Sequence, residues 1–292
     1  MLWRRGILLL GAAFTLSCKH YVVTESDFYE PWKKTLPPVS DGLQRTNAEL
    51  TTADGATLKG WLITSPGSRR AILFFNGNQI SIAQSAGELM LLASVYDADV
   101  LCFDHRGVGF TEAAVPAGAS AFVTLESDAL AAYDFFRGQE ADRDILVFGY
   151  SLGTVLATHV AAVRPVAGVV LRAPGTSVDD MIDAFTQHVP WYLRPFVRIE
   201  PDAVLAQFHP QPIEDIQKVT APLLVIHGTA DENIPFELGR KMYEAAASQK
   251  KRLCPIDGAS HDDVDFYRRR VRACMDESWG PLFGDKLAPS PR

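Results

Sequence analysis

The chain has 292 residues, and 47% of them are hydrophobic. That content is enough to bury the core of one large domain or of two small ones. A formal net charge of −7 at pH 7 argues against a general nucleic-acid-binding protein, which would carry a basic surface. The arginine-rich run at residues 267–272 is a local exception, and it is typical of the polar side of a surface helix.

Four cysteines are spread along the chain, at Cys18, Cys102, Cys254 and Cys274. They show no CxxC spacing and no Cys/His cluster, so the sequence indicates no structural zinc or other metal site. Cys102 lies in an apolar run and is predicted to be a buried thiol. Cys254 and Cys274 can pair in an oxidising compartment, but the sequence leaves that pairing open.

Residues 1–18 read MLWRRGILLLGAAFTLSC, with two arginines ahead of an apolar stretch at residues 6–16. This pattern predicts an export signal, because the apolar stretch is too short for a comfortable membrane span. Residues 14–18 resemble a relaxed bacterial lipobox, which would make Cys18 the lipidated N-terminus of a protein tethered to the cell envelope. The alternatives are an uncleaved N-terminal membrane anchor and an ordinary secreted protein.

Residues 19–45 show no clear periodicity and contain three prolines, so we expect an approach segment that packs on the outside of the domain. Residues 46–64 predict a β-hairpin, with two alternating segments joined across Asp54-Gly55. From Ala71 onward strands and helices alternate, which favours a mostly parallel sheet. The predicted strands are 71–75, 99–104, 145–148, 167–171, 223–227 and 251–255, and the predicted helices are 81–95, 120–137, 154–163, 236–247 and 263–274.

The alternation is interrupted at residues 174–219, a segment rich in proline and aromatic residues with short helical pieces such as 178–185. We expect this segment to form a small cap insert in an α/β domain that spans residues 46–283. Its aromatic side chains either line an acyl pocket or pack the cap onto the core. They are Phe185, Trp191, Tyr192, Phe196 and Phe208. The proline-rich tail at residues 284–292 is expected to be disordered.

The stretch Ile-Leu-Val-Phe-Gly-Tyr-Ser-Leu-Gly at residues 145–153 organises the chain. A short β-rich segment leads into Gly-x-Ser-x-Gly, and a small-residue helical pattern follows, which is the layout of a nucleophile elbow. Gly149 and Gly153 allow strand and helix to approach closely around a sharp bend that presents the hydroxyl of Ser151. The alternative is a glycine-rich β–α turn with a solvated serine.

A serine nucleophile needs a base, and an acid that orients the base; on such folds they follow in the order serine, acid, histidine. Asp231 follows the predicted strand 223–227, in a loop that closes on a helix. His261 lies in the loop between the last predicted strand and the last predicted helix. Among the seven histidines it alone satisfies both chain order and loop position. The alternatives are a turn-forming or helix-capping role for Asp231 and a polar loop role for His261.

An oxyanion hole requires backbone N–H groups close to the serine. Leu152, in the first turn of the helix that follows Ser151, is predicted to supply one of them. Asn78 is predicted to supply the second from the loop after the strand at residues 71–75, where Gly77 lets the backbone turn. This set of groups requires no metal and no organic cofactor.

Taken in order, these motifs resemble the α/β-hydrolase superfamily, in particular the Bem46-like serine hydrolases and the alpha/beta hydrolase domain-containing proteins 13 and 17. The resemblance covers roughly residues 46–275 and depends on six segments. They are Asn76-Gly-Asn78, Asp104-His-Arg-Gly-Val-Gly109, Gly149-Tyr-Ser-Leu-Gly153, Ala173-Pro-Gly-Thr-Ser177, His227-Gly-Thr-Ala-Asp231 and Gly258-Ala-Ser-His261. The family has His at the place of Asn76 and an aromatic residue at the place of Gly175. The resemblance implies helices on both faces of the sheet, with Ser151, Asp231 and His261 as nucleophile, acid and base.

The expected activity is hydrolysis of a carboxylic ester or thioester of an acyl substrate through a Ser-His-Asp triad and an acyl-enzyme. Because members of the resembling family act on acyl chains, some as protein depalmitoylases, a small-molecule or lipid substrate is implied. The alternatives are a serine peptidase of the same fold and a non-catalytic envelope protein that retains the fold. The expected location is the bacterial cell envelope, with the N-terminus at the membrane surface and no nucleic-acid partner.

Overall fold

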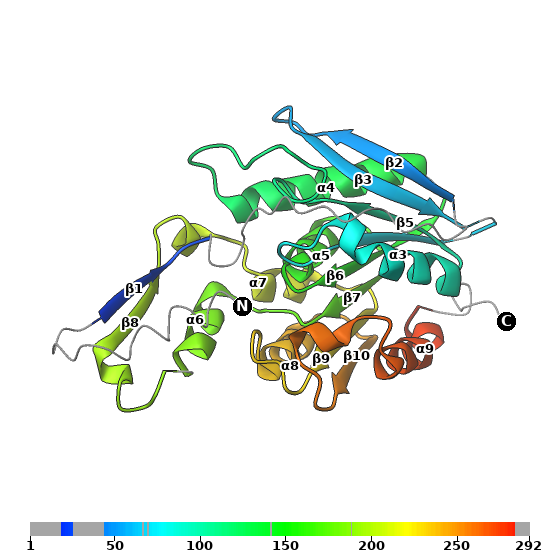
Figure 1. The fold of residues 1–292 in the computed structure, drawn as a ribbon. Helices are drawn as coiled ribbons and strands as arrows, with labels where there is room; N and C mark the ends of the chain where they lie inside the picture. The colour runs from blue at the N-terminus through cyan, green and yellow to red at the C-terminus, as the bar shows by residue number, and fades with distance from the viewer. Residues whose placement is uncertain are drawn as a thin grey trace.

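The computed structural model describes residues 19–25, 44–65, 67–68, 70–140, 142–187 and 189–283. An eight-stranded sheet lies at the centre of the described structure, in the order β10-β9-β7-β6-β4-β5-β3-β2 (Figure 1). Neighbouring strands from β10 to β5 are parallel, whereas β3 runs antiparallel to both β5 and β2. The mostly parallel sheet predicted from the alternation is therefore confirmed. The strands are β2 Gln44–Thr51, β3 Thr57–Thr64, β4 Arg70–Phe75, β5 Ala98–Phe103, β6 Asp144–Tyr150, β7 Gly168–Arg172, β9 Leu223–Gly228 and β10 Lys251–Ile256.

Helices cover both faces of this sheet, because successive residues of each buried strand point to opposite sides. Ile72 and Phe74 of β4 pack in the core layer of α3 and α9, and Leu73 and Phe75 pack in the layer of α4, α5 and α8. Strands buried on both faces read as continuous apolar runs, which is why their positions could be predicted. The helices are α3 Ile82–Tyr96, α4 Ala121–Gln139, α5 Leu152–Val163, α8 Phe236–Ala245 and α9 Arg269–Phe283.

The last predicted helix is present, but its predicted bounds, residues 263–274, are wrong. A short 3₁₀ helix, η5, covers His261–Val264, and α9 begins only at Arg269 and continues to Phe283. Asp265 between them is extended, with φ of −71° and ψ of 160°, so one continuous helix is excluded. The break leaves His261 on a short loop element instead of ahead of a rigid helix.

The cap insert lies at one end of the molecule, beside the carboxyl edge of the sheet (Figure 1). Its N-terminal helix, α6, is amphipathic and follows β7 through the segment at residues 173–177. The remaining elements are short. The cap contains α6 Val178–Gln187, η2 Arg194–Phe196, β8 Val197–Pro201, η3 Leu205–Gln207, α7 Pro212–Asp215 and η4 Ile216–Lys218.

The chain before the hairpin forms a strand that the sequence did not predict. β1, at Lys19–Val23, pairs in parallel with β8 of the cap and forms a separate two-stranded sheet. Glu25 follows this strand, and its carboxylate accepts hydrogen bonds from the backbone N–H of Ala121, at 2.6 Å, and from the hydroxyl of Ser120 at the start of α4. A carboxylate at a helix N-terminus is favourable for the orphan N–H groups and the helix dipole. The described part of the predicted approach segment therefore connects the cap to α4.

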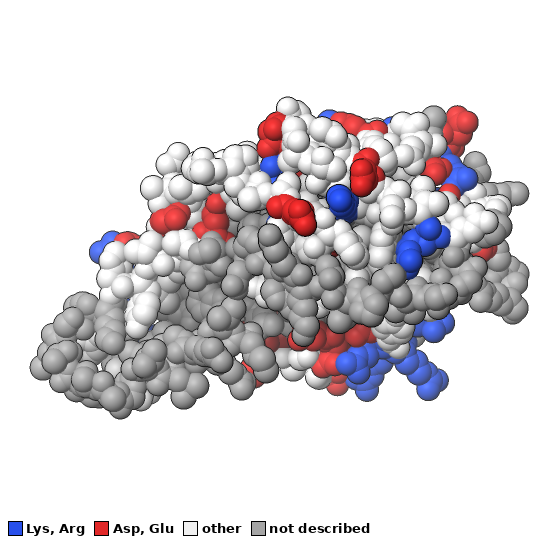
Figure 2. Space-filling view, turned by 45° about the horizontal axis from the view of Figure 1, so that its top comes forward, with Lys and Arg blue, Asp and Glu red and all other residues white. Residues whose placement is uncertain are grey.

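Cys254 and Cys274 form a disulfide, with their Cα atoms 6.4 Å apart, and Cys102 is a buried free thiol as predicted. The arginine-rich run lies on the exposed side of the start of α9, whose Val271 and Cys274 are buried. Figure 2 shows acidic and basic side chains interspersed on one face, with Lys and Arg gathered along its lower edge. Within the described ranges no helix combines the length and the apolar character needed to cross a bilayer.

Candidate active site

The bend that carries Ser151 is a sharp strand-to-helix turn. β6 ends at Tyr150 and α5 begins at Leu152, and Ser151 between them has φ of 51° and ψ of −118°. A side chain at positive φ is strained, so the surroundings must hold this conformation. A Cβ atom at Gly149 would overlap the backbone of Gly153, and one at Gly153 would overlap the carbonyl of Phe75. The two glycines are therefore required for the close approach of β6, α5 and β4.

The three side chains predicted as nucleophile, base and acid lie in one hydrogen-bonded chain. Nε2 of His261 is 2.9 Å from the hydroxyl oxygen of Ser151. On the other side of the ring, Nδ1 donates to Oδ2 of Asp231 at 2.7 Å. These residues come from β6–α5, from the loop after β9 and from η5, all at the carboxyl edge of the sheet. The separation of 110 residues between serine and histidine is closed by parallel strands that end at the same edge.

Asp231 is held in place by its own loop. Its Oδ1 accepts hydrogen bonds from the backbone N–H groups of Asn233 and Ile234, at 2.9 and 2.8 Å. Burial opposes ionisation of this carboxyl, but hydrogen bonds from His227 and His261 outweigh it and hold the pKa of Asp231 well below its usual value. The aspartate is therefore a carboxylate across the physiological pH range, as needed to orient an imidazole and stabilise its protonated form.

His227 is a residue whose role at the site was not predicted. Its side chain is completely buried behind Asp231, and its Nε2 donates to the carbonyl of Ile234 at 2.8 Å and lies 3.4 Å from Oδ2 of Asp231. Sequence alone places His227 near the site at the end of β9 but not as a base, and the structure agrees. The signal for its supporting role is a histidine four residues before the aspartate, inside a strand buried on both faces.

The loop that carries His261 is tied to the core by polar contacts. The hydroxyl of Tyr150 lies 3.2 Å from both the carbonyl oxygen of His261 and a carboxylate oxygen of Asp262. Further along, the guanidinium of Arg172 donates to the carbonyl of Val264 at 3.0 Å. These contacts fix the backbone on both sides of the short η5 element, so the imidazole does not depend on the loop alone for its position.

The two residues predicted to form an oxyanion hole follow β6 and β4, which are neighbours in the sheet. Leu152 is the first residue of α5, so its N–H has no carbonyl within the helix to donate to. Asn78 is half-buried in the loop after β4, and a Cβ atom added at Gly77 in this loop would lie 3.1 Å from the ring of Tyr150. Asn76, which replaces the family's His, points inward and donates to the hydroxyl of Ser85 at 3.0 Å.

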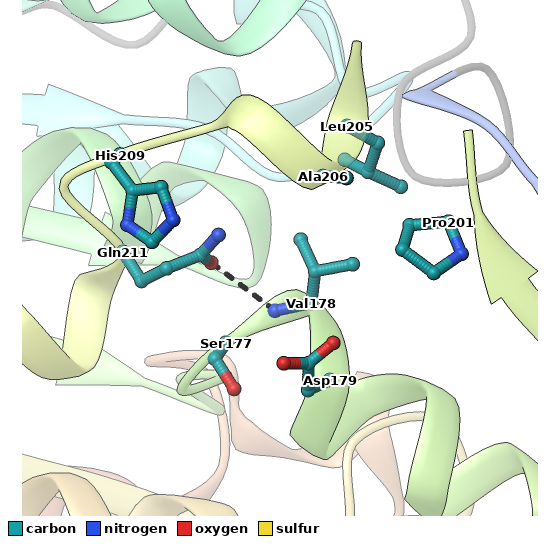
Figure 3. Close-up of a pocket in the computed structure, with 8 residues that line it drawn as sticks. All are labelled: Ser177, Val178, Asp179, Pro201, Leu205, Ala206, His209 and Gln211. Carbon is teal, nitrogen blue, oxygen red and sulfur yellow. Dashed lines mark hydrogen bonds between the residues drawn. The ribbon is translucent and has the colours of Figure 1, made fainter. Parts of the chain in front are cut away.

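A cavity of about 230 Å³ lies within the cap rather than at the triad. Figure 3 shows Val178 and Leu205 facing across it, and the side-chain oxygen of Gln211 accepts a hydrogen bond from the N–H of Val178 at 3.1 Å. The lining residues are Ser177, Val178, Asp179, Pro201, Leu205, Ala206, His209 and Gln211. None of them belongs to the triad, and none is one of the five aromatic residues proposed for an acyl pocket.

The cap aromatics instead divide between packing and exposure. Phe208 is buried and stacks on Phe122 of α4, with ring centroids 4.6 Å apart, so it packs the cap onto the core. Trp191, Tyr192 and Phe196 are exposed to solvent. Of the two predicted alternatives, packing onto the core is therefore observed for Phe208.

One group of potential metal ligands occurs among the described residues, and its partners explain it as an ion cluster. Glu126, His159 and Asp215 offer ligand atoms within 4.8 Å of one another. Nδ1 of His159 donates to Asp215 at 2.7 Å, and the ammonium of Lys218 donates to the second oxygen of Asp215 at 2.8 Å. The hydrogen bond to Asp215 raises the pKa of His159. The cluster joins α7 of the cap to α4 and α5.

Cys18, the predicted lipidation residue, and the rest of the predicted export signal lie outside the described residues. The predicted tail at residues 284–292 also lies outside them. The sites that the structure describes are therefore the group of Ser151, His261 and Asp231 at the carboxyl edge of the sheet and the cavity in the cap.

A serine on a nucleophile elbow at the carboxyl edge of a mostly parallel sheet, hydrogen-bonded to a histidine and through it to an aspartate, is the arrangement of an α/β-fold hydrolase. A family model described as serine aminopeptidase, S33 (Hydrolase_4) matches residues 69–210 and 204–264. The chain belongs to this family of α/β hydrolases.

Relatives and solved structures agree with this placement. An uncharacterized protein of Mycobacterium tuberculosis is 36% identical over 227 residues, which cover 76% of this chain and 74% of that protein. Alpha/beta hydrolase domain-containing protein 17C of Homo sapiens is 31% identical over 205 residues, covering 70% of this chain but only 56% of that protein. The Pyrococcus furiosus esterase Pf2001 has the same fold, with a TM-score of 0.65 at 19% identity over 86% of this chain and 98% of its own.

Proposed function

We propose that the protein is a serine hydrolase that cleaves carboxylic ester or thioester bonds of acyl substrates through Ser151, His261 and Asp231. The observation that supports this proposal is the continuous hydrogen-bonded chain, with 2.9 Å from serine to imidazole and 2.7 Å from imidazole to aspartate. A serine hydroxyl is a weak nucleophile until a positioned base takes its proton. His261 is positioned to be that base. Its Nδ1–H is donated to Asp231, which leaves Nε2 free to accept the proton of Ser151.

In the proposed mechanism, Nε2 of His261 takes the proton of Ser151 as its oxygen attacks the carbonyl carbon of the substrate. The imidazolium that forms is stabilised by the Asp231 carboxylate. His261 then protonates the leaving alcohol or thiol as the tetrahedral intermediate collapses to an acyl-enzyme. A water molecule, deprotonated by the same imidazole, releases the acid and restores the serine.

The oxyanion of each tetrahedral intermediate is proposed to accept hydrogen bonds from the backbone N–H groups of Leu152 and Asn78. The position of Leu152 at the first turn of α5 supports its role, since helix N-termini favour negative charge. Loss of one such donor typically costs about 3 kcal/mol of transition-state stabilisation. Only proline removes a backbone N–H, and it also fixes φ at the substituted residue. Gly77→Val, whose side chain would press on the ring of Tyr150 and displace the Asn78 loop, tests the second donor without that constraint.

The ester assignment is tested with a panel of p-nitrophenyl esters of increasing acyl length, alongside thioesters. We expect turnover by the wild type and loss of nearly all of it in Ser151→Ala. Ser65→Ala, at a serine outside the site, is the matched control. A fluorophosphonate probe is expected to label the wild type and the control but not Ser151→Ala. Labelling that persists in Ser151→Ala would identify a different nucleophile, and an unlabelled wild type would favour a non-catalytic role.

A serine peptidase is the second candidate, because the matching family model is described as serine aminopeptidase. Peptide anilides measured beside the esters separate the two activities. Cleavage of aminoacyl anilides at a higher kcat/KM than any ester would replace the ester assignment, while leaving the triad proposal in place.

We also propose that the protein is exported to a bacterial cell envelope and carries a lipid on Cys18. The observation that supports this is the sequence of residues 1–18 alone. Cys18→Ser is expected to move the protein from the membrane fraction to the soluble fraction and to remove the acyl mass from the mature N-terminus. An unmodified cysteine in a membrane-bound wild type would favour an uncleaved anchor instead.

A further inference from the structure

The cap carries a group of aromatic side chains that remain exposed to solvent among the residues that the structure describes. Trp191, Tyr192 and Phe196, which we call the aromatic tip, are 78%, 56% and 47% exposed. The rings of Trp191 and Tyr192 pack edge to face against each other, with centroids 5.9 Å apart. Three large aromatic residues exposed within six positions form a local apolar surface of the kind that marks an interaction site.

The N-terminal strand brings the start of the described chain to the same place. In the parallel pairing of β1 with β8, Lys19 lies opposite Val197, the residue directly after Phe196. Tyr21 and Val22 of β1 are also exposed, at 38% and 52%. Figure 1 shows β1 and β8 side by side at the end of the molecule away from the hairpin of β2 and β3. The apolar segment at residues 6–16 and Cys18 therefore connect to the fold beside the aromatic tip.

Charged groups around the tip are few and partly neutralised. Arg194 uses its guanidinium to hold the turn, donating to the carbonyls of Val189 and Gln187 at 2.9 and 2.8 Å. Arg198 is exposed, but it pairs with Glu200, which also accepts from His20. The tip is consequently dominated by its aromatic rings, with a weakly basic border in a chain whose net charge is −7.

We propose that the aromatic tip inserts into the interfacial layer of a lipid bilayer, as a second membrane contact beside the N-terminus. Trp and Tyr are the residues that favour this layer, because each has a large apolar ring and a polar group that reaches water. A single acyl chain gives only marginal, reversible membrane binding, and stable anchoring takes a second signal. Lys19, which follows Cys18 in the sequence, pairs with Val197 directly after Phe196, so the proposal assigns both contacts to the same lipid surface.

This contact would also orient the site. The cap insert leaves the sheet at the carboxyl end of β7, between the strands that precede Ser151 and Asp231, and it returns at the amino end of β9. In this proposal a docked cap keeps its exit from β7, and with it the carboxyl edge of the sheet, on the side of the lipid surface. The proposal concerns membrane binding only, and it holds whether or not the chemistry is ester hydrolysis.

The test compares the full chain with the variant Trp191→Ser/Tyr192→Ser/Phe196→Ser in co-flotation with phosphatidylcholine vesicles, with and without an anionic lipid. Val123→Ser/Val163→Ser, at exposed apolar positions of α4 and α5, is the matched control. We expect the tip variant to bind vesicles roughly tenfold more weakly or worse, and the control to bind as the wild type does. Turnover of a soluble short-chain ester is expected to be equal in all three proteins.

A second measurement reports directly on insertion. Lipids brominated in the acyl chain quench tryptophan that enters the bilayer, so Trp191→Phe is expected to lose part of the quenching that the wild type shows. Trp61→Phe, at a buried tryptophan, is expected to leave the quenching unchanged. Equal vesicle binding by the tip variant and the wild type would overturn the proposal. So would a wild-type oligomer that the tip variant dissociates, because the tip would then contact a second copy of the chain.

Discussion

Replacing Arg172 by Met should destabilise the fold and displace the loop of His261, because it breaks one buried ion pair. Arg172 is 2% exposed at the end of β7, and its guanidinium donates to both oxygens of Glu88 on α3. The same guanidinium donates to the carbonyl of Val264, and its Cζ atom lies 4.5 Å from the ring centroid of Phe266. Glu88 in turn accepts from the backbone N–H of Phe266 at 2.9 Å. The pair thus holds the backbone that follows His261.

The size of the expected stability loss depends on which charge remains buried after the substitution. Arg172→Met keeps most of the apolar volume but leaves the Glu88 carboxylate buried, with the N–H of Phe266 as its remaining partner. Breaking a buried pair from one side costs about 3–5 kcal/mol, whereas replacing both partners by apolar residues is often neutral. We therefore expect Arg172→Met to lower the free energy of unfolding by about 3–5 kcal/mol, and Glu88→Leu/Arg172→Met to recover most of that loss.

Measuring the activity of the double variant distinguishes the role of the ion pair in positioning the loop of His261 from its role in stability. The double variant still lacks the hydrogen bonds to Val264 and Phe266, so the loop of His261 is free to shift. A misplacement of about 1 Å can lower the rate about a hundredfold, and we expect a fall of that order in kcat with little change in KM. Urea unfolding and ester turnover test both parts. A loss of under about 1 kcal/mol in Arg172→Met, or full kcat in the double variant, would refute the reasoning.

Four further predictions concern single features. Asp231→Asn should lower kcat about 10⁴-fold with the fold intact, because an amide stabilises the wrong imidazole tautomer; ester turnover and circular dichroism check this. Gly153→Ala should abolish most activity and lower the free energy of unfolding by about 1–3 kcal/mol, since its Cβ would overlap a carbonyl of β4. Burial raises the pKa of Asp104 to about 7 from an ordinary value of 3.8, so the native state binds the extra proton between these values and stability falls as pH rises through this window; Asp104→Asn should flatten that fall in urea midpoints. Removing the disulfide with Cys254→Ser/Cys274→Ser should cost about 3 kcal/mol in denaturant unfolding, from a separation of 20 residues.

The elements that sequence predicts well here are those whose own residues determine them. The strands buried on both faces read as apolar runs, and the elbow is specified locally by Gly149 and Gly153, without which the bend cannot close. The positions of Asp231 and His261 followed from chain order at the ends of parallel strands. In each case the information needed lies within a few residues, or in the rule that parallel strands end at one edge.

The start of α9 could not be predicted because local polar contacts compete with a helical pattern. Ser260 and Asp263 form a reciprocal capping pair that starts a single 3₁₀ turn, and the carboxylate of Asp265 then accepts the N–H of Tyr267 at 2.8 Å. Such short-range hydrogen bonds offer the backbone an alternative to the helix. The far end was missed because Trp279 and other residues beyond Cys274 are buried by packing that the local pattern does not reveal.

β1 could not be predicted from the sequence for a different reason. Residues 19–23 carry two valines but no strong alternation, and their partner strand β8 lies about 180 residues further along the chain. Neither strand is stable alone, since an isolated two-stranded pair is marginal in water. Only the tertiary approach of the cap to the N-terminal segment decides the pairing, and a single sequence contains no sign of that approach.

The same distinction between local and long-range determinants explains how the candidate site is supported. His261 lies on a four-residue 3₁₀ element, which has no intrinsic stability to aim an imidazole. Its support comes from groups distant in the sequence: Tyr150 of β6 beneath the carbonyl of His261, Arg172 at Val264, and Glu88 at Phe266. Arg172 and Glu88 are polar groups buried inside the apolar layer of α3 and α9, where unmade hydrogen bonds are most costly. Tyr150 is partly buried and packs against that layer. A motif search that finds the serine, the aspartate and the histidine therefore detects the proposed reacting groups, while the free energy that positions them lies in residues no motif contains.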